Sequence, residues 1–291
     1  MGSSTTVSST TKSNRRRTGS AGSHKIAVLG CGKMGTILLE SFLERRLVTP
    51  EQAIATVQHG DRCAALSAQL GGVTVGTNNR QAVAGASIVL LCVKPQALGQ
   101  LLDEIGHALK PGTLVISIAA STTTGFIQQK LGKRVPVVRA MPNTPAMVGA
   151  GMTAVCAGPA ASAEHVQTAK HLFEGVGRAL VVDEKHMDAI TALSASGPAF
   201  VFVILEALAE AGVKVGLPRE MATTLVAQTL FGSAQLALKT GHHPALLKDA
   251  VTTPAGCTIE GLMELEKGGL RVALMNAVIK TTIRARELMT S

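Results

Sequence analysis

Tryptophan and tyrosine are absent from this chain of 291 residues, and phenylalanine occurs only six times. Single-stranded nucleic acid is commonly bound by stacking its bases on aromatic side chains, and this sequence supplies few of them. Hydrophobic residues nevertheless make up 46% of the chain, enough for a sizeable buried core. These proportions predict a globular protein built as one large domain or two smaller ones.

Cysteine pairs and long hydrophobic runs are lacking as well. The five cysteines are widely spaced, and no two of them form a CxxC pair: Cys31, Cys63, Cys92, Cys156 and Cys257. They indicate reduced thiols in a cytosol-like compartment, not a disulfide framework or a zinc site. The longest apolar run, FVFVILEALA, is interrupted at Glu206 and Glu210 before it could span a bilayer. We therefore expect a soluble, cytoplasmic protein that binds no metal and no membrane.

Acidic residues are missing from the N-terminal tail, residues 1–23, which is rich in Ser, Thr and Gly. A segment of this composition buries too little apolar surface to fold, so we expect a disordered, solvated tail. A transit peptide, an N-myristoylation signal and residues left by cloning are the alternative interpretations. Four cations of the tail contribute to the formal charge of +9, namely Lys12, Arg15, Arg16 and Arg17. The remaining positive charge suits small acidic ligands at least as well as nucleic acid.

Strand-like and helix-like segments alternate from Lys25 onward. The apolar run KIAVLG ends in glycine and leads into the periodic segment MGTILLESFLERRL. Further apolar runs follow at residues 53–57, 73–75, 87–93, 113–118, 135–139, 152–156 and 179–182. This alternation predicts an α/β fold, a Rossmann domain with a doubly wound, mostly parallel sheet over residues 24–183.

The turn Gly30-Cys31-Gly32-Lys33-Met34-Gly35 lies between the first expected strand and a helix, where G-x-G-x-x-G indicates dinucleotide binding. Gly30 permits the tight turn, Gly32 lets the backbone approach a pyrophosphate, and Gly35 allows the helix to pack closely on the strand. The helix N-terminus then faces the phosphates. A purely structural glycine turn is the alternative.

The second expected strand bears on the choice of dinucleotide. NAD-binding domains usually place Asp or Glu near the end of this strand to bind the ribose hydroxyls. Here Gln58 and His59 stand at that point and Arg62 follows, so a 2′-phosphate would be tolerated. Residues 77–79, Thr-Asn-Asn, either add hydrogen bonds on the adenosine side or cap the next helix. We expect NADPH to be preferred, with NADH as an alternative cofactor.

Two more strand ends lie where ligands of open parallel sheets bind, beyond the carboxyl ends of the strands. In Val93-Lys94-Pro95, the Lys94 side chain could neutralise a phosphate. In Ile118-Ala119-Ala120, the small alanines either leave room for a nicotinamide ring or reflect tight packing alone.

Strand signals stop after Asp183, and helix patterns continue to the end of the chain. We expect helices over residues 187–195, 198–211, 219–240, 245–251, 259–266 and 270–289. Pro218 suits the first position of a helix and Gly241 its C-cap. The helix over 219–240 is apolar around most of its circumference, more than a surface helix of a monomer tolerates. Residues 184–291 are therefore predicted to form an all-helical dimerisation domain.

The segment AVTTPAGCT, residues 250–258, interrupts these helices. Pro254 and Gly256 bend the chain, and the next helix then begins with the backbone N–H groups of residues 256–258. Such N–H groups can hold a carboxylate without an arginine, and the Thr258 hydroxyl would point at whatever that carboxylate carries. An ordinary N-cap formed by one of the threonines is the alternative.

Five segments together resemble a pyrroline-5-carboxylate reductase, the last enzyme of proline synthesis. They are LGCGKMG (29–35), VKP (93–95), RAMPNTP (139–145), TALSASGPAF (191–200) and DAVTTPAGCTIEGL (249–262). The resemblance implies reduction of a cyclic imine to L-proline by NADPH or NADH. It also implies a homodimer with interlocking helical domains, active sites between the cofactor domain and these helices, and often a pentamer of dimers.

The resemblance also implies roles for single residues. Cofactor contacts are implied for Leu29, Gly30, Cys31, Gly32, Lys33, Met34, Asn79, Cys92, Val93, Lys94, Pro95, Ile118, Ala119 and Ala120. Substrate contacts are implied for Glu184, Gly256, Cys257 and Thr258, and Thr258 would hold or orient the ring nitrogen. Departures from the family occur at Ala195, Phe200 and Ala255, where it commonly has Gly, Tyr and Gly, and at His242, where Glu-His-Pro is common.

The implied chemistry needs little from side chains, because a protonated imine is already electrophilic and orientation supplies most of the catalysis. We interpret Cys31 and Cys257 as small apolar fillers, since no partner thiol or base stands at a recognisable spacing. A β-hydroxyacid dehydrogenase is disfavoured, because no Lys is followed by Asn four positions later. A non-enzymatic basic binding protein lacks its Lys/Arg face. Another imine reductase stays open.

Overall fold

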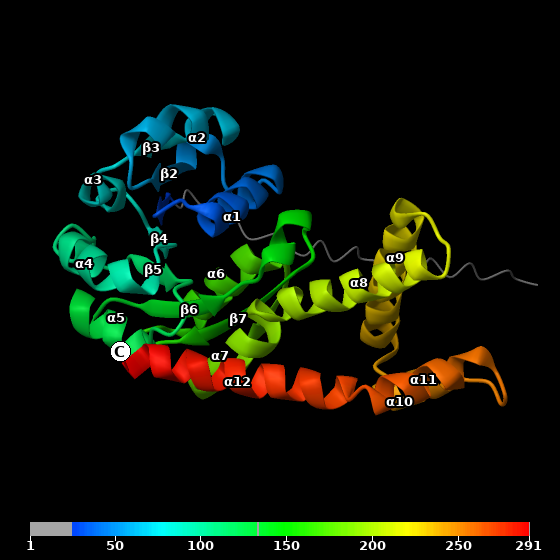
Figure 1. Cartoon of the computed structure of the whole chain (residues 1–291). Coiled ribbons are helices and arrows are strands. Elements are labelled where there is room, and N and C mark those ends of the chain that lie inside the picture. Colours follow the sequence, from blue (N-terminus) through cyan, green and yellow to red (C-terminus); the bar gives the residue numbers. More distant parts are fainter. Residues whose placement is uncertain (1–24, 133, 291) are drawn as a thin grey trace, which may run out of the picture.

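An eight-stranded sheet forms the centre of the first half of the molecule (Figure 1). The computed structural model describes residues 25–132 and 134–290, so the predictions for the N-terminal tail lie outside the described residues. The strands are β1 (Ile26–Leu29), β2 (Ala53–Thr56), β3 (Thr74–Gly76), β4 (Ile88–Leu91), β5 (Leu114–Ser117), β6 (Val137–Met141), β7 (Gly151–Ala157) and β8 (Gly177–Val181). Each strand coincides with one of the eight apolar runs of the sequence.

The strands are ordered β3-β2-β1-β4-β5-β6-β7-β8. Strands β1 to β6 run parallel to one another, β7 is antiparallel to β6, and β8 is parallel to β7. The order reverses between β1 and β4, and ligands of such sheets bind beyond the strand ends at this point. The predicted doubly wound, mostly parallel Rossmann fold is confirmed.

Helices cover both faces of the sheet, because successive strand residues point to opposite sides. Helices α1 (Lys33–Glu44), α2 (Cys63–Gln69) and α6 (Ala163–Glu174) share a buried core with Ile26 and Val28 on one face. Helices α3 (Asn79–Val83), α4 (Pro95–Ile105) and α5 (Thr124–Leu131) share a second core with Ala27 and Leu29 on the other. Short 3-10 turns connect some elements: η1 (Pro50–Gln52), η2 (Gly60–Arg62) and η3 (Thr144–Val148).

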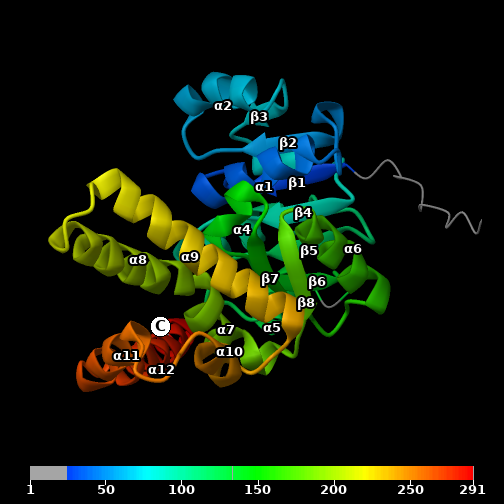
Figure 2. The same ribbon diagram turned by 90° about the vertical axis from the view of Figure 1, so that its right-hand side faces the viewer.

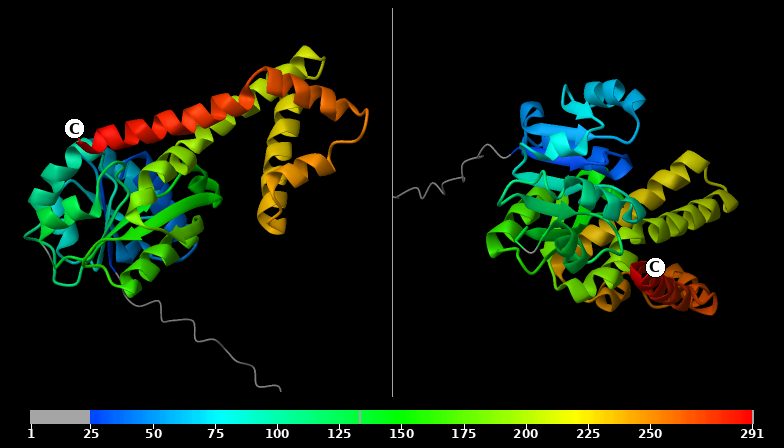
Figure 3. Two further views of the ribbon diagram at one scale, coloured as in Figure 1. Left: turned by 90° about the horizontal axis from the view of Figure 1, so that it is seen from below. Right: turned by 90° about the vertical axis from the view of Figure 1, so that its left-hand side faces the viewer.

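Helices make up the chain after β8. They are η4 (Glu184–His186), α7 (Met187–Ile190), the π-helical turn η5 (Thr191–Ala195), α8 (Gly197–Lys214), α9 (Arg219–Thr240), α10 (Pro244–Ala250), α11 (Cys257–Lys267) and α12 (Leu270–Thr290). Helices α8 and α9 pack on each other and project from the sheet (Figure 2). Helices α10 and α11 lie at the far end, and α12 runs back until its last turns lie close to α5 (Figures 1 and 3).

The ends of α9 test two local predictions. Gly241 is its C-cap in the left-handed conformation, with φ of 66°, as expected. Pro218 is the N-cap and not the first helical residue, because its ψ of 139° is extended. The predicted position of Pro218 is therefore wrong by one residue.

Much of the apolar surface of the helical half is uncovered. On α9, Leu225, Phe231 and Leu238 are 52%, 54% and 64% exposed, although the same helix buries Ala222. The largely exposed stretch Glu184–Lys214 is also long and apolar enough to cross a membrane by length and composition alone. That finding differs from the expectation from the sequence, in which Glu206 and Glu210 make the apolar run too short to span a bilayer. No part of the chain within residues 25–132 and 134–290 covers this surface.

Candidate active site

The turn after β1 has the backbone geometry that G-x-G-x-x-G requires. Gly30 has φ of 73°, and a Cβ atom there would overlap Val93 Cγ1. A Cβ atom at Gly35 would lie 3.1 Å from Cys92 Cβ, so glycine lets α1 approach the end of β4. At Gly32, by contrast, the nearest atom to such a Cβ is 3.8 Å away. The chain itself does not require glycine at position 32, whereas a closely approaching pyrophosphate would.

Helix α1 begins directly after this turn with uncapped amides. Its N-cap is Gly32, and no side chain forms a cap hydrogen bond. The first amides of an α-helix have no partner within the helix, and here they belong to Lys33, Met34 and Gly35. Together with the helix dipole, they form a site that favours the negative charge of a phosphate.

Leu29 and Cys31 support the turn from inside the protein. Both residues are buried. The Leu29 carbonyl accepts a hydrogen bond from the Cys92 amide at 2.8 Å, and the Cys31 amide donates to the Thr56 carbonyl at 2.7 Å. Their backbone groups are therefore used within the chain, and the cofactor contacts expected of them stay predictions.

A cavity of about 310 Å³ lies beside the turn, against the ends of β1, β2 and β4 and helix α4. It is lined by Gly30, Thr56, Val57, Gln58, Thr77, Asn79, Val93, Ala97, Gln100, Leu101 and Glu104. This volume lies at the lower end of the range for small-molecule pockets. Gly30, Gln58, Asn79 and Val93 were predicted cofactor residues, and the structure places them together.

A chain of hydrogen bonds runs through the residues of this cavity. Asn79 Nδ2 donates to Glu104 Oε2 at 3.1 Å, and Thr56 Oγ1 donates to Asn79 Oδ1 at 2.7 Å. Thr56 Oγ1 in turn accepts from the Gly30 amide at 3.2 Å. The network orients the Asn79 amide and ties the glycine turn to α4. Sequence reasoning missed Thr56 and Glu104, although a hydroxyl at the end of β2 was an available signal.

The residues after β2 determine how the adenosine end of a dinucleotide would be received. Gln58 lines the cavity. His59 is the N-cap of η2 and Arg62 is its last residue, and both are exposed. No carboxylate directly follows β2, and Asp61 and Arg62 lie together further on, in η2. The guanidinium of Arg62 suits a 2′-phosphate. Asn78 caps α3 by accepting a hydrogen bond from the Gln81 amide at 3.0 Å, so for Asn78 the capping interpretation is confirmed.

The two other predicted strand ends lie side by side because β4 and β5 are neighbours in the sheet. Lys94 is exposed as the N-cap of α4, with Pro95 at the first helical position. After β5, Ala119 is buried, and the Ile118 amide donates to the Leu91 carbonyl at 3.1 Å. A cation and a small-residue loop therefore border the same edge of the sheet.

The cysteines near these strands are protonated fillers. Burial raises the pKa of the Cys31 thiol and raises the pKa of the Cys92 thiol well above its ordinary value. Burial raises the pKa of Cys156 on β7 to about 12, and the nearby Glu184 carboxylate adds to the effect. Protonated thiols are poor nucleophiles, so none of the three supplies one at neutral pH. Cys257 is exposed, so its interpretation as a filler does not hold within one chain.

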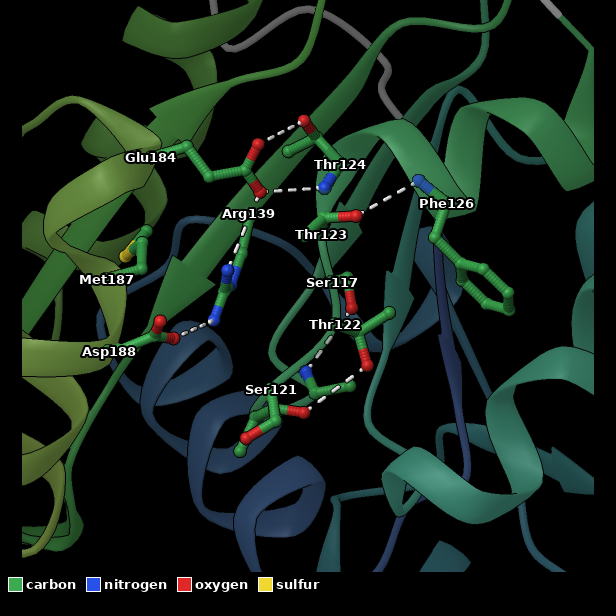
Figure 4. Close-up of polar contacts among 12 residues, drawn as sticks. Ser117, Ser121, Thr122, Thr123, Thr124, Phe126, Arg139, Glu184, Met187 and Asp188 are labelled. Carbon is green, nitrogen blue, oxygen red and sulfur yellow. Dashed lines mark hydrogen bonds and ion pairs between the residues drawn. The ribbon is translucent and has the colours of Figure 1, made fainter. Parts of the chain in front are cut away.

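Glu184, predicted as a substrate ligand, binds the nucleotide-binding half in this chain (Figure 4). Its two carboxylate oxygens accept hydrogen bonds from the amide and the hydroxyl of Thr124, each at 2.7 Å. Glu184 Oε1 also lies 3.5 Å from Nη1 of Arg139, a residue of β6 whose side chain is only 1% exposed. The contact of Glu184 with substrate therefore stays a prediction.

Arg139 has a second acidic neighbour in the same buried cluster. Its Nη2 lies 3.8 Å from Oδ1 of Asp188 on α7. Among the described residues, neither of these two atoms nor Arg139 Nε has a hydrogen-bond partner. The other Asp188 oxygen lies 3.9 Å from Nε of Arg286 on α12. The cluster thus joins β6 to the first and the last helices of the helical half.

The segment before α11 has the geometry of an anion site. The N-cap of α11 is Gly256 without a side-chain cap bond, so the alternative of a threonine N-cap is wrong. A Cβ at Gly256 would overlap Thr253 Oγ1, and Ala255 has φ of 57°, in the region that glycine prefers. The first amides of α11, those of Cys257 and Thr258, therefore have no partner within the helix and could bind a carboxylate.

The nucleotide turn and this segment lie far apart in one chain. Figure 1 shows α11 at the far end of the helical half, away from β1 and α1, and Figure 3 shows the same separation from below. One chain by itself does not bring the two segments together.

Known proteins match both halves. Residues 184–288 match the family described as pyrroline-5-carboxylate reductase dimerisation, and residues 25–121 match the family described as NADP oxidoreductase, coenzyme F420-dependent. A pyrroline-5-carboxylate reductase of Methanosarcina acetivorans is 42% identical over 91% of this chain and 97% of its own length. The chain belongs to the pyrroline-5-carboxylate reductase family.

Solved structures of pyrroline-5-carboxylate reductases share the fold. The enzyme of Coxiella burnetii has a TM-score of 0.84 and 34% identity, and the alignment covers 91% of this chain and 98% of that one. The enzyme of Plasmodium falciparum, solved with NADP bound, has a TM-score of 0.83 and 29% identity over the same shares of the two chains. The resemblance noted in the sequence is confirmed, and the chain is an oxidoreductase.

The match to pyrroline-5-carboxylate reductase dimerisation covers the segment from η4 into α12. This segment carries the uncovered apolar surface of α8 and α9. The chain therefore forms homo-oligomers, as predicted from the apolar circumference of α9, because a second copy covers what one chain leaves exposed.

Proposed function

We propose that the chain reduces pyrroline-5-carboxylate to L-proline with NADPH. One observation in this member of the family carries the proposal. Helices α1 and α11 both begin after a glycine N-cap, and neither has a side-chain hydrogen bond to its first amides. The first suits a pyrophosphate and the second suits a carboxylate. Pyrroline-5-carboxylate has one carboxylate on a cyclic imine, and NADPH supplies the hydride.

The cofactor would be held by residues that line or border the cavity. The amides of residues 33–35 would bind the pyrophosphate, and Arg62 would neutralise the 2′-phosphate while Gln58 and His59 leave room for it. Asn79, oriented by Thr56 and Glu104, would face the adenosine side. Lys94 would add positive charge, and the nicotinamide ring would lie against Ala119 and Ala120. When bound, NADPH supplies the hydride from this ring.

The substrate carboxylate would be held by the amides at the start of α11, and the Thr258 hydroxyl would orient the ring nitrogen. The protonated imine accepts the hydride at its C=N carbon, and the π electrons of that bond move to nitrogen, giving the secondary amine of proline. The nitrogen carries its proton before the hydride arrives, so no side chain has to supply one in this step. Thr258 would then act by orienting the imine toward the nicotinamide. Holding the two reactants together in this way makes hydride transfer effectively unimolecular.

We propose that each complete site combines the nucleotide turn of one chain with the α11 segment of another. The distance between the two in one chain supports this arrangement (Figure 1). The assembly would be a homodimer, and five dimers could combine into a decamer. Residues 24–183 and 184–291 would be its two domains, an assignment supported by the end of β8 at Val181. The unpaired cysteines support a cytoplasmic location.

Steady-state NADPH oxidation tests the proposal. Pyrroline-5-carboxylate should be turned over with a kcat/KM at least about tenfold above that of a six-membered piperideine carboxylate, since one methylene is worth roughly that much discrimination. NADPH should be preferred to NADH. Turnover of the six-membered ring alone would identify another imine reductase, and oxidation of β-hydroxy acids alone would identify a dehydrogenase of that type. Turnover of none of these substrates would refute the proposal.

A further inference from the structure

Ser121 has an unusual backbone for its residue type. Its φ is 55°, in the left-handed region that favours glycine. The residue is buried, with 7% exposure, and it directly follows Ile118–Ala120, the loop proposed to lie beside the nicotinamide. Strained backbone that persists at such a place is held by its surroundings and is frequently part of a functional site.

The contact that holds Ser121 comes from the other half of the molecule. Its hydroxyl donates a hydrogen bond at 2.9 Å to the carbonyl oxygen of Ala285 on α12, 164 residues away in the chain. Ala285 is 5% exposed, although most of α12 is exposed. Residue 285 also lies within the segment matched as pyrroline-5-carboxylate reductase dimerisation. The dimerisation half therefore contacts the loop directly.

The rest of the loop is fixed by its own polar contacts (Figure 4). The Ala119 amide donates to Ser117 Oγ at 3.2 Å, and Thr122 Oγ1 donates to the Ala120 carbonyl at 3.3 Å. These bonds connect the loop internally, and the bond from Ser121 to α12 is one of the contacts by which the helical half reaches it, beside Glu184 on Thr124 and the cluster of Met187 against Ala120. A displacement of α12 would be passed to the backbone of residues 118–120.

We propose that Ser121 is a positioning residue for hydride transfer. Its bond to α12 holds the Ile118–Ala120 loop where the nicotinamide ring has to lie, and so couples the dimerisation half to the distance between hydride donor and acceptor. Small displacements at this point reduce the rate of a transfer that depends on orientation. This inference rests on the proposed reduction of pyrroline-5-carboxylate.

Two substitutions separate this role from simple strain. Ser121→Ala removes the hydroxyl and keeps the strain, whereas Ser121→Gly removes the hydroxyl and relieves the strain. We expect both variants to lower kcat by about tenfold, the effect of losing one positioning hydrogen bond. The Kd of NADPH, followed by its fluorescence on binding, should stay within about twofold, because the phosphate contacts are untouched.

Stability should respond differently from rate. The melting temperature should fall for Ser121→Ala and stay near that of the original protein for Ser121→Gly. The kinetic isotope effect with NADPH deuterated at the transferred position should increase in both variants, because hydride transfer becomes more rate-limiting. Arg46→Gly is the matched control: Arg46 is exposed with φ of 57°, so relief of strain there should raise stability without changing kcat.

The possible outcomes are decisive. Normal kcat in both variants, or normal kcat in Ser121→Gly together with low kcat in Ser121→Ala, would overturn the positioning role. A rise in the Kd of NADPH that accounts for the lost activity would also overturn it, since the residue would then serve binding. If the original protein does not turn over pyrroline-5-carboxylate, the proposed function is refuted, and this inference with it. That result is distinct from failure of the positioning role alone, in which the original protein is active and the variants behave as described above.

Discussion

The nucleotide-binding half and the helical half differ in how completely one chain covers their apolar surface. In the first half the strands β1, β4, β5 and β6 are buried along their whole length, and helices cover both faces of the sheet. Within residues 197–288 the buried hydrophobic residues are Ala209, Ala222 and Ala285 alone. The first half therefore completes its own core, and the second is the contribution of one chain to a core shared with another.

The two proposed binding segments differ in the same way. The glycine turn after β1 is braced by Thr56, Asn79 and Glu104 of its own half, so its geometry is set within one chain. The segment before α11 is largely exposed, and α11 lies away from β1 and α1 of its own chain (Figure 1). The geometry of the glycine turn is thus set within one chain, whereas the α11 segment would need a second chain to meet a nucleotide site, if both act as proposed.

The largest expected effect comes from charging the exposed face of α9. In the variant Leu225→Glu with Phe231→Glu, the dimer should dissociate, because four apolar side chains per symmetric interface are lost, at about 6 kcal/mol or more in total. Light scattering should show a monomer that still binds NADPH but has lost imine reduction.

Val148→Glu is the comparison variant for the nucleotide-binding half. Val148 is 80% exposed on η3 and lies outside the segment matched as pyrroline-5-carboxylate reductase dimerisation, so the charge should leave assembly and activity unchanged. If it dissociates the protein as well, the first half is no more self-sufficient than the second, and the contrast between them is lost.

The next largest effect concerns the joint between the halves. Arg139→Ala leaves the carboxylates of Glu184 and Asp188 without their buried cation, and we expect the free energy of unfolding to fall by about 3 kcal/mol. Urea denaturation followed by circular dichroism measures this. Arg139→Lys keeps the charge and should lose clearly less, while a loss below about 1 kcal/mol in the Ala variant would mean that the cluster adds little to the joint.

Thr258→Ala examines the start of α11. Loss of a hydrogen bond to a charged group should raise the barrier by about 1.5–3 kcal/mol, or roughly ten- to a hundredfold in kcat/KM, with NADPH binding intact. Thr258→Ser keeps the hydroxyl and should recover most of the activity. Unchanged kcat/KM in the Ala variant would remove Thr258 from the active site.

The smallest effect is expected at Ala255. Its φ of 57° strains any residue other than glycine, so Ala255→Gly should raise the free energy of unfolding by about 1 kcal/mol. Ala245→Gly, inside α10, should lower it by roughly 0.5–1 kcal/mol, because glycine is unfavourable within a helix. If both variants lower the free energy of unfolding, glycine does not release backbone strain at residue 255.

Local signals predicted most of the architecture. The eight apolar runs became the eight strands, and five of the helix patterns became α8 to α12 with small shifts at their ends. The pattern over 187–195 became α7 followed by the π-helical turn η5. Gly30 and Gly35 have the steric roles expected of them, since those roles depend on a turn and its immediate packing. Pro218 was misplaced by one residue, because its N-cap conformation is set by the loop before it.

The partners of the polar residues could not be predicted in this way. Thr56, Asn79 and Glu104 lie on three separate elements, and Glu184 was expected at the substrate but binds Thr124, 60 residues away. The sequence shows that such side chains are present. It does not show which of them meet, since that depends on the path of the chain between them.

Local sequence patterns specify the order of strands and helices, the glycine turn after β1 and the apolar character of α9. These features follow from hydrophobic period and from turn chemistry, which act over a few neighbouring residues. Long-range packing alone brings α12 back to Ser121 and places Arg139 between acidic side chains of the other half. It also decided that α11 lies away from the cofactor turn of its own chain, because the packing of long helices against one sheet sets where each end comes to lie (Figure 1).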